Sequence, residues 1–440
     1  MTGPGLTGAD LTAPGLTAPG RAGLGRAGLG WSGRATVGSG SYRADDVTFL
    51  LTDLSDVALE RPTEDREEDF ARGRHYSEDL PVEYAPTEAY LRLFEASLAG
   101  AASRVATAVG VMTERVLAYQ PEPVIVSLAR AGTPAGILAR RWAAARHGLD
   151  LPHYAVSIIR DRGLDLVAMR WILERHPAER VVFVDGWTGK GVITGVLAAA
   201  ADELRSAGVH VDPTLAVLAD PGHCTTVFGT RADFLIPHSC LNSTVSGLVS
   251  RTVLNPELLG PGDFHGAKYY RELAGQDYSR RYVDTVAQAF PAVADAVTAE
   301  LATPVDATPT WSGWQAVERL AASVGVGNVG LVKPGVGETT RVLLRRVPWK
   351  VVIAPDRRDE LAHILALCAD KGVAVEERDD LPYACVGIIR PGAGADRAAV
   401  SASTATAGPN RPAAPNRPAA LDRLAALDRP AALDRPAVPE

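Results

Sequence analysis

Short apolar runs that alternate with helical segments are the pattern that most restricts how this chain can fold. Five such runs occur between residues 120 and 240, at 124–128, 154–159, 180–184, 215–218 and 234–236. Helices are expected within 91–120 and at about 135–147, 164–174 and 192–207. Strands that are apolar at every position need cover on both faces, and helical crossovers join them in parallel. The pattern predicts an α/β domain at 39–290, with a parallel sheet between two layers of helices.

A second, smaller α/β unit is predicted at 311–390, after a linker at 291–310 that is rich in Ala, Pro and Thr. Its strands are expected at 329–332, 351–354, 373–376 and 384–389, and its helices at about 338–346 and 358–371. The two ends, 1–38 and 391–440, hold much of the 42 Gly and 31 Pro of the 440-residue chain, in short repeats. Such repeats bury too little apolar surface to offset the entropy of ordering, so both ends are predicted to be disordered.

Composition excludes several classes of protein. No run approaches the roughly 20 apolar residues that span a membrane. Four cysteines without Cys-x-x-Cys spacing argue against a disulfide scaffold or a zinc module. The net charge of −7 argues against nucleic-acid binding over the whole surface and leaves room for a local basic face. Because the N-terminus lacks the continuous apolar core of a secretory signal, a cytoplasmic protein is expected.

The turn after the third apolar run carries residues suited to holding a phosphate. Asp185 ends the run, and Thr188, Gly189, Lys190 and Gly191 lead from it into a helix. The glycines allow close approach of the backbone, the exposed amides and the helix dipole favour an anion, and the lysine adds a positive charge. The spacing differs from that of a Walker loop. The alternative is an ordinary strand–helix turn in which glycine serves the geometry alone.

A second turn, after the first apolar run, has similar features. Its candidate anion-binding residues are Arg130, Ala131, Gly132 and Thr133. Parallel strands end at the same edge of a sheet, so both turns are expected to face one crevice. Arg160 and Arg162, after the second run, would add positive charge there. Alternatively, Arg160 forms a surface ion pair with its neighbour Asp161.

Together the two turns resemble the phosphate and pyrophosphate loops of type I phosphoribosyltransferases. The resemblance implies that residues 188–191 hold the 5′-phosphate of 5-phosphoribosyl-1-pyrophosphate, or of a related phosphoribosyl nucleotide, and that residues 130–133 stabilise the departing pyrophosphate. It also implies that Asp185 binds the ribose hydroxyls together with Mg²⁺. The family has two consecutive acids at that point, whereas Gly186 follows Asp185 here.

The main functional prediction is therefore transfer of the phosphoribosyl group to an unknown base or nucleoside-like acceptor, with Asp185 and Arg130 as the catalytic residues. A nucleotide sensor without turnover, which regulates through an RNA-binding domain, is the first alternative. A homo-oligomer is compatible with the sequence.

Further motifs extend the resemblance along the chain. They lie at 39–42, 75–78, 157–163, 240–247 and 263–268. With the two turns, they are similar to a bacterial family that fuses a phosphoribosyltransferase-like domain to a Pelota-type RNA-binding domain. The resemblance places the chain among proteins of tellurium-resistance and stress gene clusters. That family is also described as the cysteine protease StiP family.

The C-terminal unit contains a basic segment that fits RNA binding. Residues 333–341 are similar to the Asn-Glu-x-Thr-Lys segment with which kink-turn-binding ribosomal proteins grip RNA, although Gly337 replaces the Asn. Residues 341–350 hold four positive charges and no acid, and contacts of that kind with phosphates supply affinity. The alternative is a solvated helix face. The predicted RNA-binding residues are Lys333, Glu338, Thr340, Arg341, Arg345 and Arg346.

A cysteine protease is the second alternative to phosphoribosyl transfer. It needs a thiolate beside a histidine base, and such pairs assemble from distant parts of a fold. Sequence spacing therefore does not establish a pair here. Cys240 is the best candidate nucleophile. The other residues considered are Cys224 as nucleophile and His75, His223, His238 and His265 as bases.

Overall fold

The structure is a computed structural model that describes residues 31–62 and 74–390. The segments predicted to be disordered, 1–38 and 391–440, lie outside the described residues apart from 31–38. Residues 31–38 differ from the prediction, because they pack against the larger domain. Arg34 forms an ion pair with Asp263 at 2.9 Å, and the ring of Trp31 stacks on Phe264. One charged and one aromatic contact thus anchor this segment.

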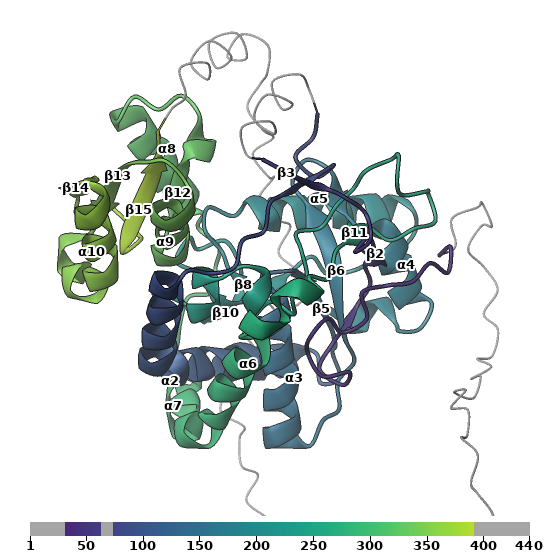
Figure 1. Cartoon of the computed structure of the whole chain (residues 1–440). Helices are drawn as coiled ribbons and strands as arrows, with labels where there is room; N and C mark the ends of the chain where they lie inside the picture. The colour runs from purple at the N-terminus through teal and green to yellow at the C-terminus, as the bar shows by residue number, and fades with distance from the viewer. Residues whose placement is uncertain (1–30, 63–73, 391–440) are drawn as a thin grey trace, which may run out of the picture.

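The larger domain is built on a seven-stranded sheet (Figure 1). The chain passes from β5 (Val124–Ala129) to its neighbour β6 (His153–Ile159) and then crosses to β8 (Val181–Trp187) on the other side of β5. The boundary between β5 and β8 is therefore the switch point, the place at which open parallel sheets bind ligands. The short β7 (Gly163–Leu164) pairs antiparallel with β6, and every other pair is parallel, which confirms the predicted parallel sheet. The parallel strands run in the order β1 (Thr48–Phe49), β6 (His153–Ile159), β5 (Val124–Ala129), β8 (Val181–Trp187), β9 (Leu215–Ala219) and β10 (Val227–Thr230).

Alternate side chains of the central strands enter two hydrophobic cores. Ile125 and Val182 face one core, whereas Val126 and Phe183 face the other. Helices therefore cover both faces of the sheet, as the continuous apolar runs require. The first core is covered by α2 (Glu88–Tyr119), α3 (Thr133–His147), α6 (Ser279–Gln288) and α7 (Phe290–Ala302), and the second by α4 (Leu166–Leu173) and α5 (Val192–Ser206).

The C-terminal domain has a four-stranded mixed sheet in the order β12 (Val332–Pro334), β15 (Cys385–Ile389), β13 (Pro348–Ile353) and β14 (Ala374–Glu377). Helix α8 (Ser312–Ser323) packs on one face, and α9 (Val336–Arg345) and α10 (Ala362–Lys371) pack on the other. The domain lies beside the start of α2, where the hydroxyl of Tyr90 donates to the carbonyl of Leu344 (Figure 1).

Several short elements complete the fold. β2 (Thr52–Asp53) pairs with β11 (Gly266–Ala267), and β3 (Glu60–Arg61) pairs with β4 (Leu80–Pro81). The 3₁₀ helices are η1 (Ala178–Arg180), η2 (Pro237–Cys240), η3 (Ser243–Val245), η4 (Arg271–Gln276), η5 (Val329–Leu331) and η6 (Pro355–Leu361).

Several segments differ from the predicted elements. The strand expected at 329–332 is η5 followed by β12. The run at 234–236 is not a strand. β10 forms the edge strand beside β9 instead, and Phe234 and Ile236 fill the first core from irregular chain. The predicted linker at 291–310 begins with most of α7, because Val293 and Val297 bury one side of that Ala-rich stretch. Helix α8 was not predicted. Among the described residues, no helix is long and apolar enough to cross a membrane.

Candidate active site between the two domains

The turn after β8, residues 185–191, is in contact with the C-terminal domain. The Nζ atom of Lys190 donates to the carbonyl oxygens of Val329 and Val332, and the Tyr383 hydroxyl donates to the carbonyl of Gly189 at 3.1 Å. Burial, together with the positive charge of Lys333, lowers the pKa of Lys190 to about 7. The groups predicted to hold a phosphate are therefore occupied by another part of the same chain.

Glycine is required in this turn by the neighbouring domain. Gly191 precedes α5 with a φ of +81°, a conformation that side chains other than Gly rarely adopt. A Cβ at this position would lie 2.2 Å from the ring of Trp311. The hydroxyl of Thr188 is likewise occupied, since it donates to the buried carboxylate of Asp220 at the end of β9. The glycine and threonine of the predicted phosphate turn thus serve interdomain packing.

Asp220 organises the loop on which this packing depends. Its carboxylate accepts from the backbone amides of Cys224 and Thr225 and from the guanidinium of Arg231. The loop in turn holds the C-terminal domain, because the amide of Gly313 donates to the carbonyl of Gly222 at 3.1 Å. Sequence reasoning missed Asp220, although an acid directly after an apolar run was the same signal that singled out Asp185.

The turn after β5 lies against β8 and beside a separate cavity. A Cβ on Gly132 would lie 2.4 Å from the carbonyl oxygen of Val184, so a larger residue does not fit there. Ala131 continues this turn, and Thr133 is fully buried. The guanidinium of Arg130 donates to the carbonyl of Val249 at 3.1 Å. The cavity has a volume of about 130 Å³ and is lined by Tyr76, Ala129, Arg130, Ile158, Ile159, Arg251 and Thr252.

The two other predicted arginines lie at the end of β6. The backbone amide of Arg160 donates to the hydroxyl of Tyr76, and the guanidinium of Arg162 lies 3.7 Å from the carboxylate of Glu78. Their side chains are exposed. The structure therefore brings Arg160 close to the residues of the cavity beside the β5 turn.

Asp185 and His238 lie at the switch point between the two turns. The amide of Gly186 donates to the Asp185 carboxylate at 2.7 Å, and burial raises the pKa of Asp185 to about 7. The His238 ring packs against Trp187, and its Nδ1 atom lies 3.2 Å from the Tyr282 hydroxyl. Its Nε2 atom is buried without a hydrogen-bond partner, and burial lowers the pKa of His238 to about 3. His238 is therefore neutral here.

Residues 237–242, which we term the cysteine turn, are held by two arginines of α9. The Nε atom of Arg341 donates to the carbonyl of Ser239 at 3.2 Å. One terminal nitrogen of Arg345 donates to the carbonyl of Cys240 at 2.6 Å, and the other donates to the side-chain oxygen of Asn242. Two residues predicted to bind RNA thus make the contacts that close this turn.

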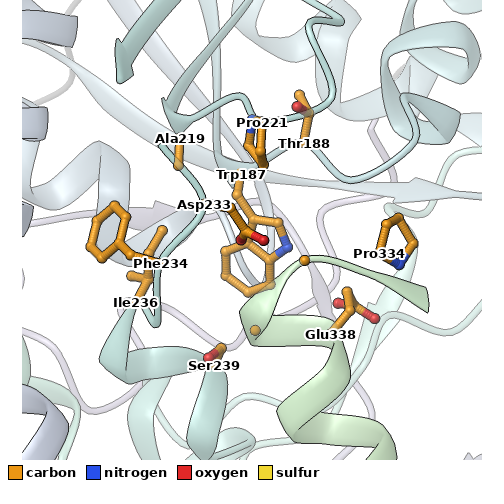
Figure 2. A pocket seen from close by; sticks show the side chains of 12 residues that line it. Trp187, Thr188, Ala219, Pro221, Asp233, Phe234, Ile236, Ser239, Pro334 and Glu338 are labelled. Carbon is orange, nitrogen blue, oxygen red and sulfur yellow. The ribbon is translucent and has the colours of Figure 1, made fainter. Parts of the chain in front are cut away.

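Cys240 is fully buried in this closed turn. Its sulfur lies 4.0 Å from the Ser97 hydroxyl. Burial raises the pKa of the Cys240 thiol to about 11, although the charges of Arg345 and Arg341 act in the opposite direction. Close by, a small pocket opens between the domains, with Trp187 and Ser239 on one side and Glu338 on the other (Figure 2).

The remaining cysteines lie in different surroundings. Cys224 is buried beside Asp220, and burial together with that negative charge raises the pKa of its thiol. Cys368 and Cys385 are buried in the core of the C-terminal domain. His75 and His265 form hydrogen bonds with Ser77 and Ser157, and the carbonyl of His223 accepts from Trp311. Within residues 31–62 and 74–390, no cysteine sulfur forms a hydrogen bond with a histidine.

The predicted RNA-binding residues differ in their exposure to solvent and in their partners. Arg346 is exposed and Lys333 is half-buried, whereas Thr340 is fully buried and donates to the carbonyl of Val336. Glu338 and Arg341 form an ion pair at 3.0 Å. In the described part of the chain, no group of three or more Asp, Glu, His or Cys side chains is placed to hold a metal ion. The expected Mg²⁺ stays a prediction.

Comparison with known proteins identifies two matching families. Residues 40–287 match the family model described as "Tellurite-like stress resistance cysteine protease StiP", and residues 311–391 match the PELOTA RNA binding domain. The chain is 33% identical over 365 residues to "Cysteine protease StiP" of Acinetobacter baylyi, an alignment that covers 80% of this chain and 94% of the relative. No solved structure matches the chain.

These matches correct the main functional prediction. Both the family model and the relative name a cysteine protease, so the prediction of a phosphoribosyltransferase that binds 5-phosphoribosyl-1-pyrophosphate is wrong. The physical reason is visible in the turn after β8. A phosphate and a domain surface rich in carbonyl oxygens favour the same residue types, and here Lys190 contacts carbonyl oxygens. The Pelota-type RNA-binding domain is confirmed.

Proposed function

The chain belongs to the StiP family, and from that membership we propose that it is a cysteine peptidase whose nucleophile is Cys240. The observation that carries the proposal is the match to the curated cysteine protease, which extends over 94% of that protein. A match of this extent includes both domains rather than one shared module. The structure supports the choice of cysteine and suggests how the site would work.

Cys240 is the cysteine with the most favourable electrostatic surroundings. The thiolate is the reactive form of cysteine, and positive charges nearby stabilise it. Arg341 and Arg345 act in this way on Cys240, whereas Asp220 acts in the opposite direction on Cys224. Cys368 and Cys385 lie in the core of the C-terminal domain, away from the sheet edge where the two domains meet.

His238 is the base that best fits this nucleophile. It lies on the same 3₁₀ helix, two residues before Cys240, and its Nε2 atom has no hydrogen-bond partner. In the proposed reaction Nε2 accepts the thiol proton, and the sulfur attacks the peptide carbonyl carbon. The C–N bond then breaks as the amine leaves with that proton, and water hydrolyses the thioester. The interdomain pocket beside Ser239 has a volume of about 10 Å³, so it would have to widen before a substrate side chain could enter.

The described conformation is closed, and the proposal requires the cysteine turn to move. The Cys240 sulfur is fully buried, and no hydrogen bond joins it to His238 in the described residues. Exposure to water would also move the pKa of His238 upward from about 3, since burial is the main cause of the lowered value. Opening would therefore give a substrate access to the Cys240 sulfur and would make His238 a stronger base.

The experiment is a peptidase assay on the full chain with casein and a fluorogenic peptide library. Cys240→Ser is expected to lower kcat/KM by about a thousandfold or more, because removing a nucleophile removes the covalent pathway. Cys224→Ser is the matched control, buried at the same interface, and is expected to retain activity. Full activity of Cys240→Ser, or loss in Cys224→Ser alone, would contradict the assignment.

For the larger domain we propose the type I phosphoribosyltransferase topology without the transfer activity. The support is the strand order, in which β6 and β8 flank β5 and the turns after β5 and β8 face one another across the switch point. An experimental structure tests this directly. A different strand order, or a crossover of opposite hand, would contradict it.

A further inference from the structure

We infer that RNA bound to the C-terminal domain competes with the cysteine turn for Arg341 and Arg345, and that RNA thereby exposes Cys240. The exposure of Cys240 is inferred from the contacts of the interface and does not depend on the proposed function. Its consequence, that RNA activates peptide cleavage, rests on the proposed function. Four observations support the competition.

The first observation is the use of the guanidinium groups. Both terminal nitrogens of Arg345 and the Nε atom of Arg341 donate to uncharged oxygens of the cysteine turn. Hydrogen bonds from arginine to a phosphate are charge-assisted and about twice as strong as those to neutral oxygens. A phosphate that reaches these two side chains therefore offers them a better acceptor than the turn does.

The second observation is the position of these arginines on a basic surface. Arg341 and Arg345 lie one helical turn apart on α9, and the exposed Arg346 follows directly. No acidic residue occurs within 341–350. RNA that first binds at Arg346 thus lies next to Arg345 in the chain. The segment that matches the RNA-binding domain includes all three arginines.

The third observation is an excess of positive charge behind the turn. Arg130 of the larger domain adds to the charges of Arg341 and Arg345, and two acids face the cluster, Glu83 and the Glu338 that pairs with Arg341. Burial and these like charges lower the pKa of Arg345 to about 10. An incoming phosphate would reduce this repulsion, so the cluster is suited to accept an anion.

The fourth observation is that the two arginines of α9 supply polar contacts between the C-terminal domain and the cysteine turn. Within the larger domain, Cys240 and Leu241 pack in the first core, and the Nδ1 atom of His238 lies 3.2 Å from the Tyr282 hydroxyl. The rest of the interface has its own contacts. Asp233 accepts from the amides of Val336 and Ala384, and Lys190 binds two carbonyls. Loss of the arginine contacts would therefore leave these other interdomain contacts in place.

The experiment measures alkylation of Cys240 by iodoacetamide in the full chain, resolved by peptide mass spectrometry. Unfractionated tRNA and oligouridine serve as the RNA probes. Saturation with at least one RNA is expected to raise the alkylation rate of Cys240 by about tenfold or more, as for a local opening. Cys368, in the C-terminal core, is the internal control and is expected to stay unchanged.

Three variants separate competition from a general loosening. Arg345→Ala is expected to raise alkylation without RNA and to lower the slope of log affinity against log salt by about one. Arg346→Ala, the matched control, is expected to weaken RNA binding to a similar degree while RNA-free alkylation stays at the wild-type rate. Asn242→Ala removes the acceptor of Arg345 that belongs to the cysteine turn and leaves Arg345 itself in place. It is therefore expected to raise RNA-free alkylation and to strengthen RNA binding.

Several outcomes would overturn the inference. They are unchanged or slower alkylation of Cys240 with saturating RNA, no binding of either RNA, equal RNA-free alkylation rates in Arg345→Ala and Arg346→Ala, or weaker RNA binding by Asn242→Ala. The readout does not depend on catalysis. RNA-dependent alkylation without peptide cleavage would reject the proposed function alone, whereas cleavage without an RNA effect would reject the competition alone.

Discussion

The turn after β8 and the cysteine turn both contact the C-terminal domain, but through different kinds of contact. The turn after β8 is held by Gly191, which fits against Trp311, by the buried Asp220 behind it, and by the hydroxyl of Tyr383. The cysteine turn is held by two long arginine side chains. The difference indicates that one part of the interface is fixed and the other can be released. The fixed part is the turn after β8, whose sequence resembles that of a phosphate-binding turn.

The largest expected effect comes from the acid behind the fixed part. Asp220→Ala leaves the guanidinium of Arg231 without its buried partner, and removing one side of a buried ion pair typically costs about 3 to 5 kcal/mol. Urea unfolding followed by tryptophan fluorescence measures the loss. The control Asp202→Ala removes an exposed ion pair with Arg205 on α5 and is expected to change stability by less than about 1 kcal/mol. Equal effects would remove the distinction between the two parts.

The glycine before α5 gives the next largest effect. Gly191→Ala forces a side chain into positive φ and against Trp311, and we expect a loss of about 3 kcal/mol from strain and overpacking. Gly195→Ala is the matched control within α5, where a Cβ meets nothing within 4 Å. That change is expected to stabilise the helix by about 0.5 to 1 kcal/mol. A Gly191→Ala protein as stable as wild type would show that Trp311 does not pack there in solution.

The fixed part should also respond to pH through Asp233. Burial raises the pKa of Asp233 to about 6, so the folded state keeps its proton to higher pH than the unfolded state does. Stability from this group is complete below about pH 4 and is lost as the pH rises through 6, by about 3 kcal/mol in total. Asp233→Asn should remove this dependence, and Asp202→Asn should not. Unfolding free energies at pH 4.5 and 7, an interval chosen to bracket about pH 6, test the sign.

The smallest effect is expected from a single hydroxyl. Tyr383→Phe removes the hydrogen bond to the Gly189 carbonyl and should lower the unfolding free energy by about 1 kcal/mol. The exposed Tyr84 supplies the control, since Tyr84→Phe is expected to have no measurable effect. RNA-free alkylation of Cys240 should stay at the wild-type rate in Tyr383→Phe. Faster alkylation would mean that the two parts of the interface are coupled.

The central strands could be predicted from the sequence because they contain short, nearly continuous apolar runs. β10 was missed because Gly229 and Thr230 interrupt its apolar character, and Phe234 and Ile236 imitate a strand although they fill the core from irregular chain. Helix α8 was missed as well. In each case the local pattern was too short to show which segment the sheet recruits.

The contacts of the predicted site residues could not be read from the sequence. Residues 188–191 were predicted to hold a phosphate, but Lys190 and Gly189 contact Val329, Val332 and Tyr383, which lie more than 130 positions away in the chain. Local residue types show that a turn is made for close approach and do not show what approaches it. For the same reason, spacing alone did not reveal that Arg345 reaches the carbonyl of Cys240.

The hydrogen bonds of Asp233 have a consequence for the order in which the chain folds. Helix α9 has no side-chain cap of its own, and Asp233 accepts from the amide of its first residue, Val336. The first amides of a helix need such a partner. During synthesis the larger domain leaves the ribosome first and presents this carboxylate before α9 exists. The N-terminal domain thus acts as a template for the first turn of α9, and α9 made without it would fray at its start.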